Sequence, residues 1–207
     1  TMRTKVMLSA AAALAVTAVT AQAQVYSVNT VGYVNQTLPA DTLVAISNPL
    51  DNGTNDLNSV LASVPAKSTA QFWTGSGFSL ATKGATWSPN ESIPPGKGFF
   101  VNSKSTITNT YVGEVAANAG ESVTNALPAD ALALVGSPLP YAGDLNTVEI
   151  GLLGVPAKST AQFWNGAGYD LSTKGTTWSP ALPINVADGF FVNSKAAYDW
   201  VQTAPAN

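Results

Sequence analysis

Short segments rich in Val, Ile, Thr and aromatic residues alternate with clusters of Gly, Pro and Asn along most of the chain. β-branched and aromatic residues favour strands, and such clusters are typical of turns. In the first half of the chain the pattern predicts strands over residues 25–34, 42–46, 69–73, 78–82, 98–102 and 107–115. Short strands joined by frequent turns indicate a sandwich or a barrel rather than βαβ units.

A short helix is predicted in each half of the chain. Apolar residues at helical spacing mark it, namely Leu57, Val60 and Leu61 in the first half and Leu145, Val148 and Leu152 in the second. Asp56 and Asp144 lie at the start of these segments, where a carboxylate complements the helix dipole.

Two Gly-Phe-Phe-Val segments begin at Gly98 and Gly189. Adjacent side chains on a strand point to opposite faces, so both faces of each segment carry a Phe ring. We therefore expect these strands to be covered on both sides and to lie centrally in their sheets.

The body of the chain is one sequence written twice. Residues 64–104 align without a gap to residues 155–195, and 28 of the 41 positions are identical. Upstream, residues 38–50 match residues 127–139 at 7 of 13 positions. Internal similarity of this kind is typical of repeated structural units.

The repeat predicts two tandem duplicated antiparallel β-sandwich-like units, each with one short helix. The first unit covers residues 24–115 with a repeat core of 38–104, and the second covers residues 116–207 with a core of 127–195. A unit of this size without a disulfide is marginally stable alone. We therefore expect the two units to pack on each other about a pseudo-twofold axis.

The first 23 residues have the pattern of a signal peptide. Arg3 and Lys5 precede an uncharged run rich in Ala, Val and Leu, and Ala21-Gln22-Ala23 is a small-x-small cleavage pattern. Cleavage after Ala23 predicts a secreted protein of the periplasm, the cell surface or the extracellular space, with no membrane span after cleavage. An uncleaved N-terminal anchor is the alternative.

Composition excludes several kinds of chemistry. The chain contains no His and no Cys, which removes an imidazole base, a thiolate nucleophile and the common zinc ligands, so we expect no metal and no cofactor. Loss of Arg3 and Lys5 with the signal peptide leaves seven Lys against twelve acidic residues, a change in net charge from −3 to −5. Nucleic-acid binding needs a basic patch, which this chain lacks. Residues 51–56 are rich in oxygen ligands for Ca²⁺, but a solvated turn is the alternative.

The tryptophans are the candidate ligand-binding residues. Trp73 and Trp164 begin short turns that place them opposite Phe78 and Tyr169, and this predicts cross-strand aromatic pairs. Trp87 and Trp178 lie in Thr-Trp-Ser-Pro segments without an obvious partner, so they are candidates for exposed rings that stack on sugars. All four are candidate glycan-stacking residues, with packing as the alternative, whereas Trp200 is predicted to be a core residue.

These motifs resemble a group of duplicated, uncharacterised secreted β-rich proteins of environmental Gram-negative bacteria. The elements that carry the resemblance are the segment 25–34, the W-x-G-x-G-[FY] turns and the G-F-F-V strands. The W-N-G-x-G-Y and G-F-F-V elements are also similar to β-sandwich modules found beside adhesins and in large surface proteins of such bacteria. The resemblance implies a structural role and no catalytic residues. The segment before Gly189, Val186-Ala187-Asp188, departs from the Pro95-Gly96-Lys97 of the first repeat and leaves its turn type open.

The sequence therefore favours an exported, non-enzymatic structural or adhesive protein of the cell envelope or extracellular matrix, which acts through β-mediated assembly or surface contact. Its expected partner is a second copy, as a homo-oligomer or filament, or a surface polysaccharide. The alternative function is a carbohydrate-binding module that stacks glycans on exposed Trp. A carboxylate-dependent hydrolase is the third hypothesis, although the acidic positions shared by both repeats, Asp41 with Asp130 and Asp56 with Asp144, have local roles in turns and caps.

Overall fold

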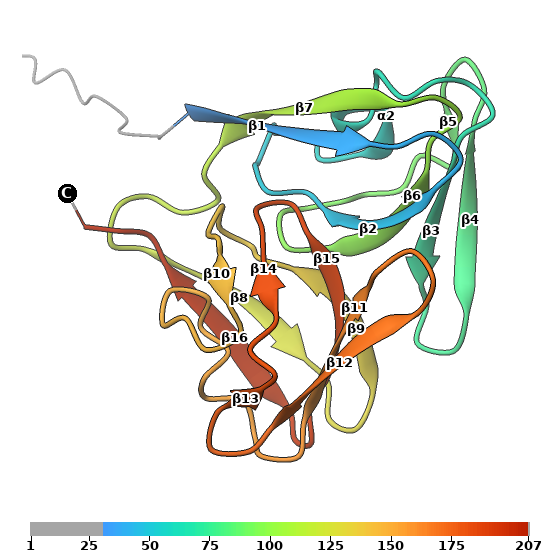
Figure 1. The fold of residues 1–207 in the computed structure, drawn as a ribbon. Helices are drawn as coiled ribbons and strands as arrows, with labels where there is room; N and C mark the ends of the chain where they lie inside the picture. The colour runs from blue at the N-terminus through green and yellow to red at the C-terminus, as the bar shows by residue number, and fades with distance from the viewer. Residues whose placement is uncertain (1–30, 207) are drawn as a thin grey trace, which may run out of the picture.

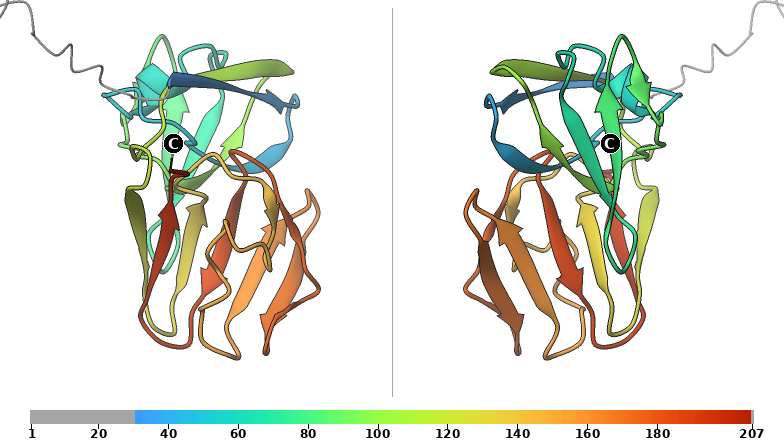
Figure 2. Two further views of the ribbon diagram at one scale, coloured as in Figure 1. Left: turned by 90° about the vertical axis from the view of Figure 1, so that its left-hand side faces the viewer. Right: turned by 90° about the vertical axis from the view of Figure 1, so that its right-hand side faces the viewer.

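A computed structural model describes residues 31–206, and it is mainly β, with several antiparallel sheets (Figure 1). The expected signal peptide and the first part of the predicted strand 25–34 lie outside the described residues. Two groups of strands are distinguishable in the side views (Figure 2). We call β1–β7 with α2 the first lobe and β8–β16 the second lobe. In the described part of the chain, no helix has the length and apolar character needed to cross a membrane.

The first lobe contains a five-stranded sheet in the order β2-β6-β3-β4-β5 and a two-stranded sheet of β1 and β7. Its strands are β1 (Val31–Leu38), β2 (Leu43–Ser47), β3 (Thr69–Trp73), β4 (Phe78–Lys83), β5 (Trp87–Ser88), β6 (Gly98–Asn102) and β7 (Ile107–Glu114). The five predicted strands that lie wholly within the described residues are confirmed to within one residue at each end, whereas the strand predicted over 25–34 continues to Leu38. The two-residue strand β5 was not predicted, because so short a segment carries no periodic pattern.

The second lobe has a five-stranded sheet in the order β9-β15-β11-β12-β13, a two-stranded sheet of β8 and β16, and a short pair of β10 and β14. Its strands are β8 (Ser122–Leu127), β9 (Leu132–Gly136), β10 (Gly143–Asp144), β11 (Thr160–Trp164), β12 (Tyr169–Lys174), β13 (Trp178–Ser179), β14 (Pro183–Ile184), β15 (Gly189–Asn193) and β16 (Tyr198–Thr203). Trp73 pairs with Phe78 in the first lobe, and Trp164 pairs with Tyr169 in the second.

The predicted helices differ between the lobes. α2 (Leu57–Val60) is capped by Asp56, whose side chain accepts from the N–H of Ser59 while the Ser59 hydroxyl accepts from the N–H of Asp56. The prediction of a helix in the second half is wrong: Asp144 belongs to β10 and its carboxylate accepts from the N–H of Asn146. That bond closes a tight turn in place of a helix N-cap, and turns follow it.

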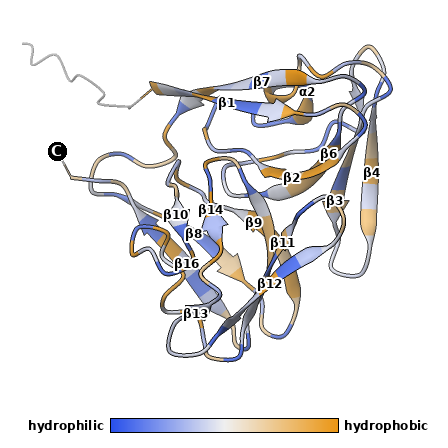
Figure 3. Cartoon of the chain, viewed as in Figure 1, coloured by the Kyte–Doolittle hydropathy of each residue, from blue (hydrophilic) through white to orange (hydrophobic). Residues whose placement is uncertain are grey.

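Each lobe has its own core, and a third apolar cluster joins the lobes. Phe99 lies in the core of the first lobe and Phe190 in the core of the second. Their neighbours Phe100 and Phe191 point to the other face of each sheet and pack together between the lobes. The expectation that the Gly-Phe-Phe-Val strands are covered on both sides is therefore confirmed. Figure 3 shows the hydrophobic colouring of β2, which also faces this junction.

The lobes also exchange backbone hydrogen bonds at the starts of β6 and β15. The N–H of Gly136 in β9 donates to the carbonyl of Gly96, and the N–H of Ser47 in β2 donates to the carbonyl of Ala187. Ala187 adopts a φ of 71° and Gly96 a φ of 82°, so the two turns have the same left-handed conformation despite their different sequences. Each lobe thus extends the edge of the other lobe's sheet.

Candidate functional site: the tryptophans and the open strand edges

Trp87 and Trp178 are buried, with 2% and 1% of their surface exposed. The indole N–H of Trp87 donates to the carbonyl of Leu61 over 3.1 Å, and that of Trp178 donates to the carbonyl of Leu152 over 3.0 Å. A sugar can stack only on an accessible ring face. The expectation that these two rings are exposed for glycan stacking is wrong.

Both buried tryptophans are hydrogen-bonded by an Asn side chain from a segment that packs beside them. Oδ1 of Asn58 accepts from the backbone N–H of Trp87 over 2.6 Å, and Oδ1 of Asn146 accepts from the N–H of Trp178 over 2.8 Å. The Asn side chains in turn donate to the carbonyls of the same tryptophans. The covering segments lie about thirty residues upstream, so the local Thr-Trp-Ser-Pro pattern does not reveal them.

Trp73 and Trp164 lie at the junction of the lobes. The indole N–H of Trp73 donates to the carbonyl of Leu132 over 2.9 Å, and that of Trp164 donates to the carbonyl of Leu43 over 2.8 Å. Their rings also make edge contacts with Phe78 and Tyr169, each at 5.2 Å between ring centroids, which confirms the predicted pairs. Both tryptophans are thus used in contacts between the lobes.

Trp200 is confirmed as a core residue. It is fully buried in the second lobe, and its indole N–H donates to the carbonyl of Ile150 over 2.5 Å. Gln202 donates to the same carbonyl and lies beside it on β16. This strand therefore has a polar and aromatic inner face that is fully packed.

The acidic positions shared by both repeats have structural roles. Asp41 accepts from the ammonium group of Lys104 over 2.6 Å, and Asp130 accepts from that of Lys195 over 2.9 Å. Both aspartates adopt a positive φ near 50°, which is consistent with the predicted turns. These ion pairs are exposed, where the net contribution of a pair to stability is small.

The oxygen-rich segment 51–56 uses its side chains for hydrogen bonds within the loop. Oδ1 of Asp51 accepts from the N–H of Gly53 and from the side chain of Asn55, each over 2.7 Å. Oδ1 of Asn52 accepts from the N–H groups of Thr54 and Asn55. These bonds form a turn of the Asx type, as the alternative interpretation predicted. Within residues 31–206, no group of three potential acidic ligands is placed to hold a metal ion.

A hollow of about 180 Å³ near the linker between the lobes is lined by Asp51, Glu114 and Glu121. Oε2 of Glu121 accepts from both nitrogens of Asn118, and Oδ1 of Asp51 is held by its own loop. A larger groove of about 630 Å³ runs between β8 and β9 and is lined by Trp73 and by residues 94–97, 124–126 and 132–135. Its lining contains Lys97 but no carboxylate, so it lacks the pair of acids that glycoside hydrolysis requires.

β1 forms one edge of its two-stranded sheet. Glu114 on β7 exchanges two backbone hydrogen bonds with Asp51, on the side of β7 away from β1. Glu114 and Val31 therefore form a pair that is not joined by hydrogen bonds. The N–H and C=O of Val31 point away from β7. By the alternation of a strand, the same holds for Tyr33, Asn35 and Thr37. Among the described residues, these outward groups have no backbone partner on another strand.

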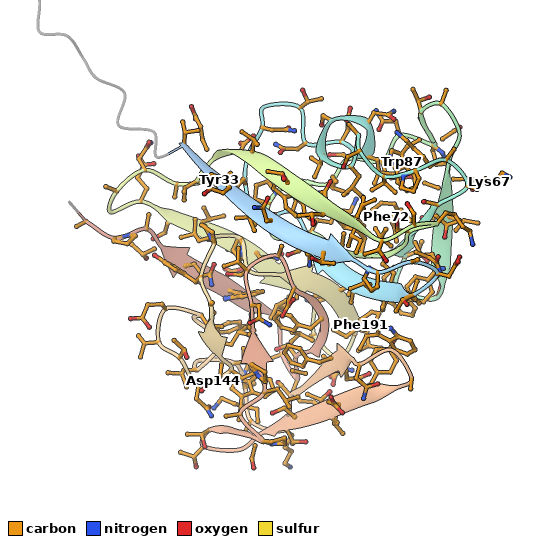
Figure 4. All side chains as sticks on the ribbon, turned by 45° about the horizontal axis from the view of Figure 1, so that its top comes forward. Tyr33, Lys67, Phe72, Trp87, Asp144 and Phe191 are labelled. Atoms are coloured by element: carbon orange, nitrogen blue, oxygen red, sulfur yellow. The ribbon has the colours of Figure 1, made fainter. Side chains whose placement is uncertain are left out.

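The outer face of this edge strand is apolar at its start. Tyr33 is 74% exposed and lies opposite Val112, which is also exposed, and Val31 is its exposed neighbour on the same face. Figure 4 shows Tyr33 on the outer sheet, away from Phe72 and Trp87 inside the lobe. At the equivalent position of the second lobe, Ser122 lies opposite Thr203. The two outer faces therefore differ in polarity.

No protein-family model, curated protein or solved structure matches the chain. The geometry of the strands and of the lobe junction is therefore the basis for a function.

Proposed function

We propose that this chain is an exported, non-enzymatic structural or adhesive protein of the cell envelope or extracellular matrix, and that it acts through β-mediated assembly. The observation that carries the proposal is the open edge of β1, with its outward N–H and C=O groups and its exposed Tyr33. An uncharged strand edge that is neither covered nor blocked by Pro or Lys is a template for a strand of another chain.

The edges of the two large sheets are protected. β5 and β13 have two residues each and are followed by Pro89 and Pro180, which lack a backbone donor. The edges of β2 and β9 are extended by residues of the opposite lobe. Within residues 31–206, β1, with eight residues and no charge, has neither form of protection. This contrast supports β1 as the strand that accepts a partner.

We also propose that the two lobes are the tandem duplicated units 24–115 and 116–207, related by a pseudo-twofold axis. The large sheets have corresponding strand orders, and Thr69 pairs with Thr82 as Thr160 pairs with Thr173. The crossed bonds of Trp73 and Trp164 support the same relationship. Export through a signal peptide that is removed after Ala23 is part of this proposal, on the basis of the sequence pattern alone.

Proline at Tyr33 tests the edge directly. The N–H of Tyr33 points to the open edge, so Tyr33→Pro removes an outward donor without a ladder bond to β7. Tyr33→Thr is the matched control, because it removes the ring but keeps the donor. We expect light scattering and electron microscopy of the chain that begins at residue 24 to show assemblies for the wild type and for Tyr33→Thr. Tyr33→Pro should lose them. Assembly by Tyr33→Pro at the wild-type level would show that the β1 edge is not the contact.

A further inference from the structure

Four large apolar side chains are exposed on the hairpins of the two lobes. Phe78 and Leu80 on β4 and Tyr169 and Leu171 on β12 are each between 44% and 55% exposed. The ring of Phe191 lies between them, with centroids 6.5 Å from Phe78 and 5.9 Å from Tyr169. We call these four side chains, with the Phe191 ring at their centre, the aromatic band. Figure 4 shows the Phe191 ring among neighbouring rings at the junction.

The band follows from the alternation of the strands. Phe78 and Leu80 share one face of β4, while Ala81 on the other face is buried in the core of the first lobe. The outer face of this sheet packs against the second lobe along β2 and β6, through Ala45 and Phe100. That contact reaches Phe78 at the start of β4 but not Leu80, which is exposed. The band is therefore a continuation of the lobe junction to the surface.

The chemistry of this face suits an apolar contact. Gln71 and Thr82 flank Leu80, and Gln162 and Thr173 occupy the corresponding positions around Leu171, so the adjoining positions on this face are uncharged. Burial of this face would therefore avoid the cost of taking an ion out of water. The four side chains expose roughly 350 Å² of apolar surface, from typical areas for side chains of this size. A stable dimer buries about 800 Å² per partner, with an apolar centre and a polar rim. The four side chains would form the apolar centre, and the surrounding polar residues would have to supply the rest of the buried area.

We propose that a second copy of this chain docks on the aromatic band. Phe78 and Leu80 in the first repeat correspond to Tyr169 and Leu171 in the second, and the Phe191 ring lies near both Phe78 and Tyr169. A half-turn of the second copy therefore lays Phe78 and Leu80 on Tyr169 and Leu171 of the partner, and the flanking Gln and Thr side chains supply the rim. A twofold contact of this kind is self-complementary and closes as a dimer.

The dimer contact on the aromatic band is separate from the β1 edge and does not depend on it. Only the step from dimers to a longer assembly rests on the proposed function of β1. A face contact alone gives a closed dimer. A face contact together with an edge contact links dimers into an open chain, because each copy then has two different interfaces. The aromatic band would in that case supply the dimer unit, and β1 would connect the units.

Paired charge substitutions test the band. Leu80→Asp with Leu171→Asp places two charges on exposed positions of the band, and Val148→Asp with Val201→Asp places the same two charges on exposed positions elsewhere. Sedimentation velocity over a range of concentrations measures the dimer. We expect the wild type and the Val148 and Val201 variant to form dimers with equal affinity. The Leu80 and Leu171 variant should raise the dissociation constant by at least tenfold.

Two results would overturn the band contact: a wild-type chain that is monomeric at every concentration, or equal dimerisation by the Leu80 and Leu171 variant. Far-UV circular dichroism and the urea midpoint verify that each variant is folded, and Leu80→Gln with Leu171→Gln replaces any variant that is not.

Tyr33→Pro separates the two proposals. If it keeps the dimer but loses longer assemblies, both contacts are supported. If it abolishes all association while the Leu80 and Leu171 variant associates normally, the edge contact stands and the band contact is wrong.

Discussion

The indole N–H of Trp73 donates to the carbonyl of Leu132, 59 residues further along the chain and in the other lobe. The reciprocal bond joins Trp164 to Leu43 over 121 residues. Each hairpin therefore reaches across the junction and is held by the opposite lobe. Trp73 and Trp164 therefore hold the two lobes together.

Trp73→Phe should weaken this junction without a large change in packing. The substitution keeps an aromatic ring beside Phe78 but removes the donor to Leu132. The loss of one such hydrogen bond costs about 0.5–1.5 kcal/mol, more if the carbonyl remains buried without a partner. Urea denaturation should show a decrease of this size in the free energy of unfolding, and Trp164→Phe should show a similar one. No decrease in either variant would mean that these bonds do not stabilise the junction.

Gly98→Ala and Gly189→Ala should be more damaging. A Cβ at Gly98 would lie 2.7 Å from the backbone nitrogen of Val135, and a Cβ at Gly189 would lie 2.5 Å from the carbonyl oxygen of Ile46. Both neighbours are backbone atoms of the opposite lobe, so the lobes would have to separate. Overpacking of this kind costs about 1–3 kcal/mol.

Gly77→Ala and Gly168→Ala are the matched controls for these substitutions. Neither added Cβ would have an atom within 4 Å, and neither glycine has a positive φ. We expect both controls to change the unfolding free energy by less than about 0.5 kcal/mol. Equal effects at Gly98 and Gly77 would contradict the close approach of the lobes.

Asp188 should make stability depend on pH at the lobe junction. Burial raises the pKa of its carboxyl above the ordinary value of 3.8, while hydrogen bonds from Asn185 oppose this shift. A raised pKa in the folded state means that the contribution to stability is fully present below pH 3.8 and is lost as the pH rises through the folded pKa. Asp188→Asn should therefore gain stability relative to the wild type as the pH rises from acid to neutral.

Asp56→Asn should show the opposite trend. Slight burial raises the pKa of Asp56, but hydrogen bonds from Ser59 and Asn90 outweigh it and lower the pKa. A lowered pKa means that the contribution is present at neutral pH and is lost as the pH falls below 3.8. Urea denaturation of both variants at a series of pH values measures the two slopes. Slopes of the same sign would contradict one of the two assignments.

A fragment that ends at residue 115 should not behave as a stable monomer. Without the second lobe, Phe100 and the ring of Trp73 lose their contacts with Phe191. The two repeats carry equivalent residues at the junction, since Leu43 corresponds to Leu132 and Phe100 to Phe191. We expect the fragment either to remain unfolded or to form a dimer in which two first lobes clasp each other. Size-exclusion chromatography and circular dichroism measure this, and a folded monomer would show that the first lobe is independent.

The strands were predictable to the extent that their patterns are local. Thr69–Trp73 and Gly98–Asn102 occupy the predicted residues because β-branched and aromatic residues bounded by turn residues specify strands without reference to the rest of the chain. The Asp56 cap was predictable for the same reason. Asp144 was not, because the three extra residues in the second repeat and the pairing of β10 with β14 replace the helix there with turns.

Only the tertiary structure decided what the aromatic residues do. Trp73 and Trp87 both adjoin predicted turns. Trp87 is buried beneath α2 and the turn that follows it, whereas the indole of Trp73 reaches the second lobe. Burial depends on which distant segment covers a side chain, and no local pattern carries that information. By itself the sequence determined the repeat, the strands and the absence of His and Cys chemistry. The lobe junction depends on which distant segments pair and pack with each other. The open edge of β1 and the aromatic band are the edge and the face that this packing leaves uncovered.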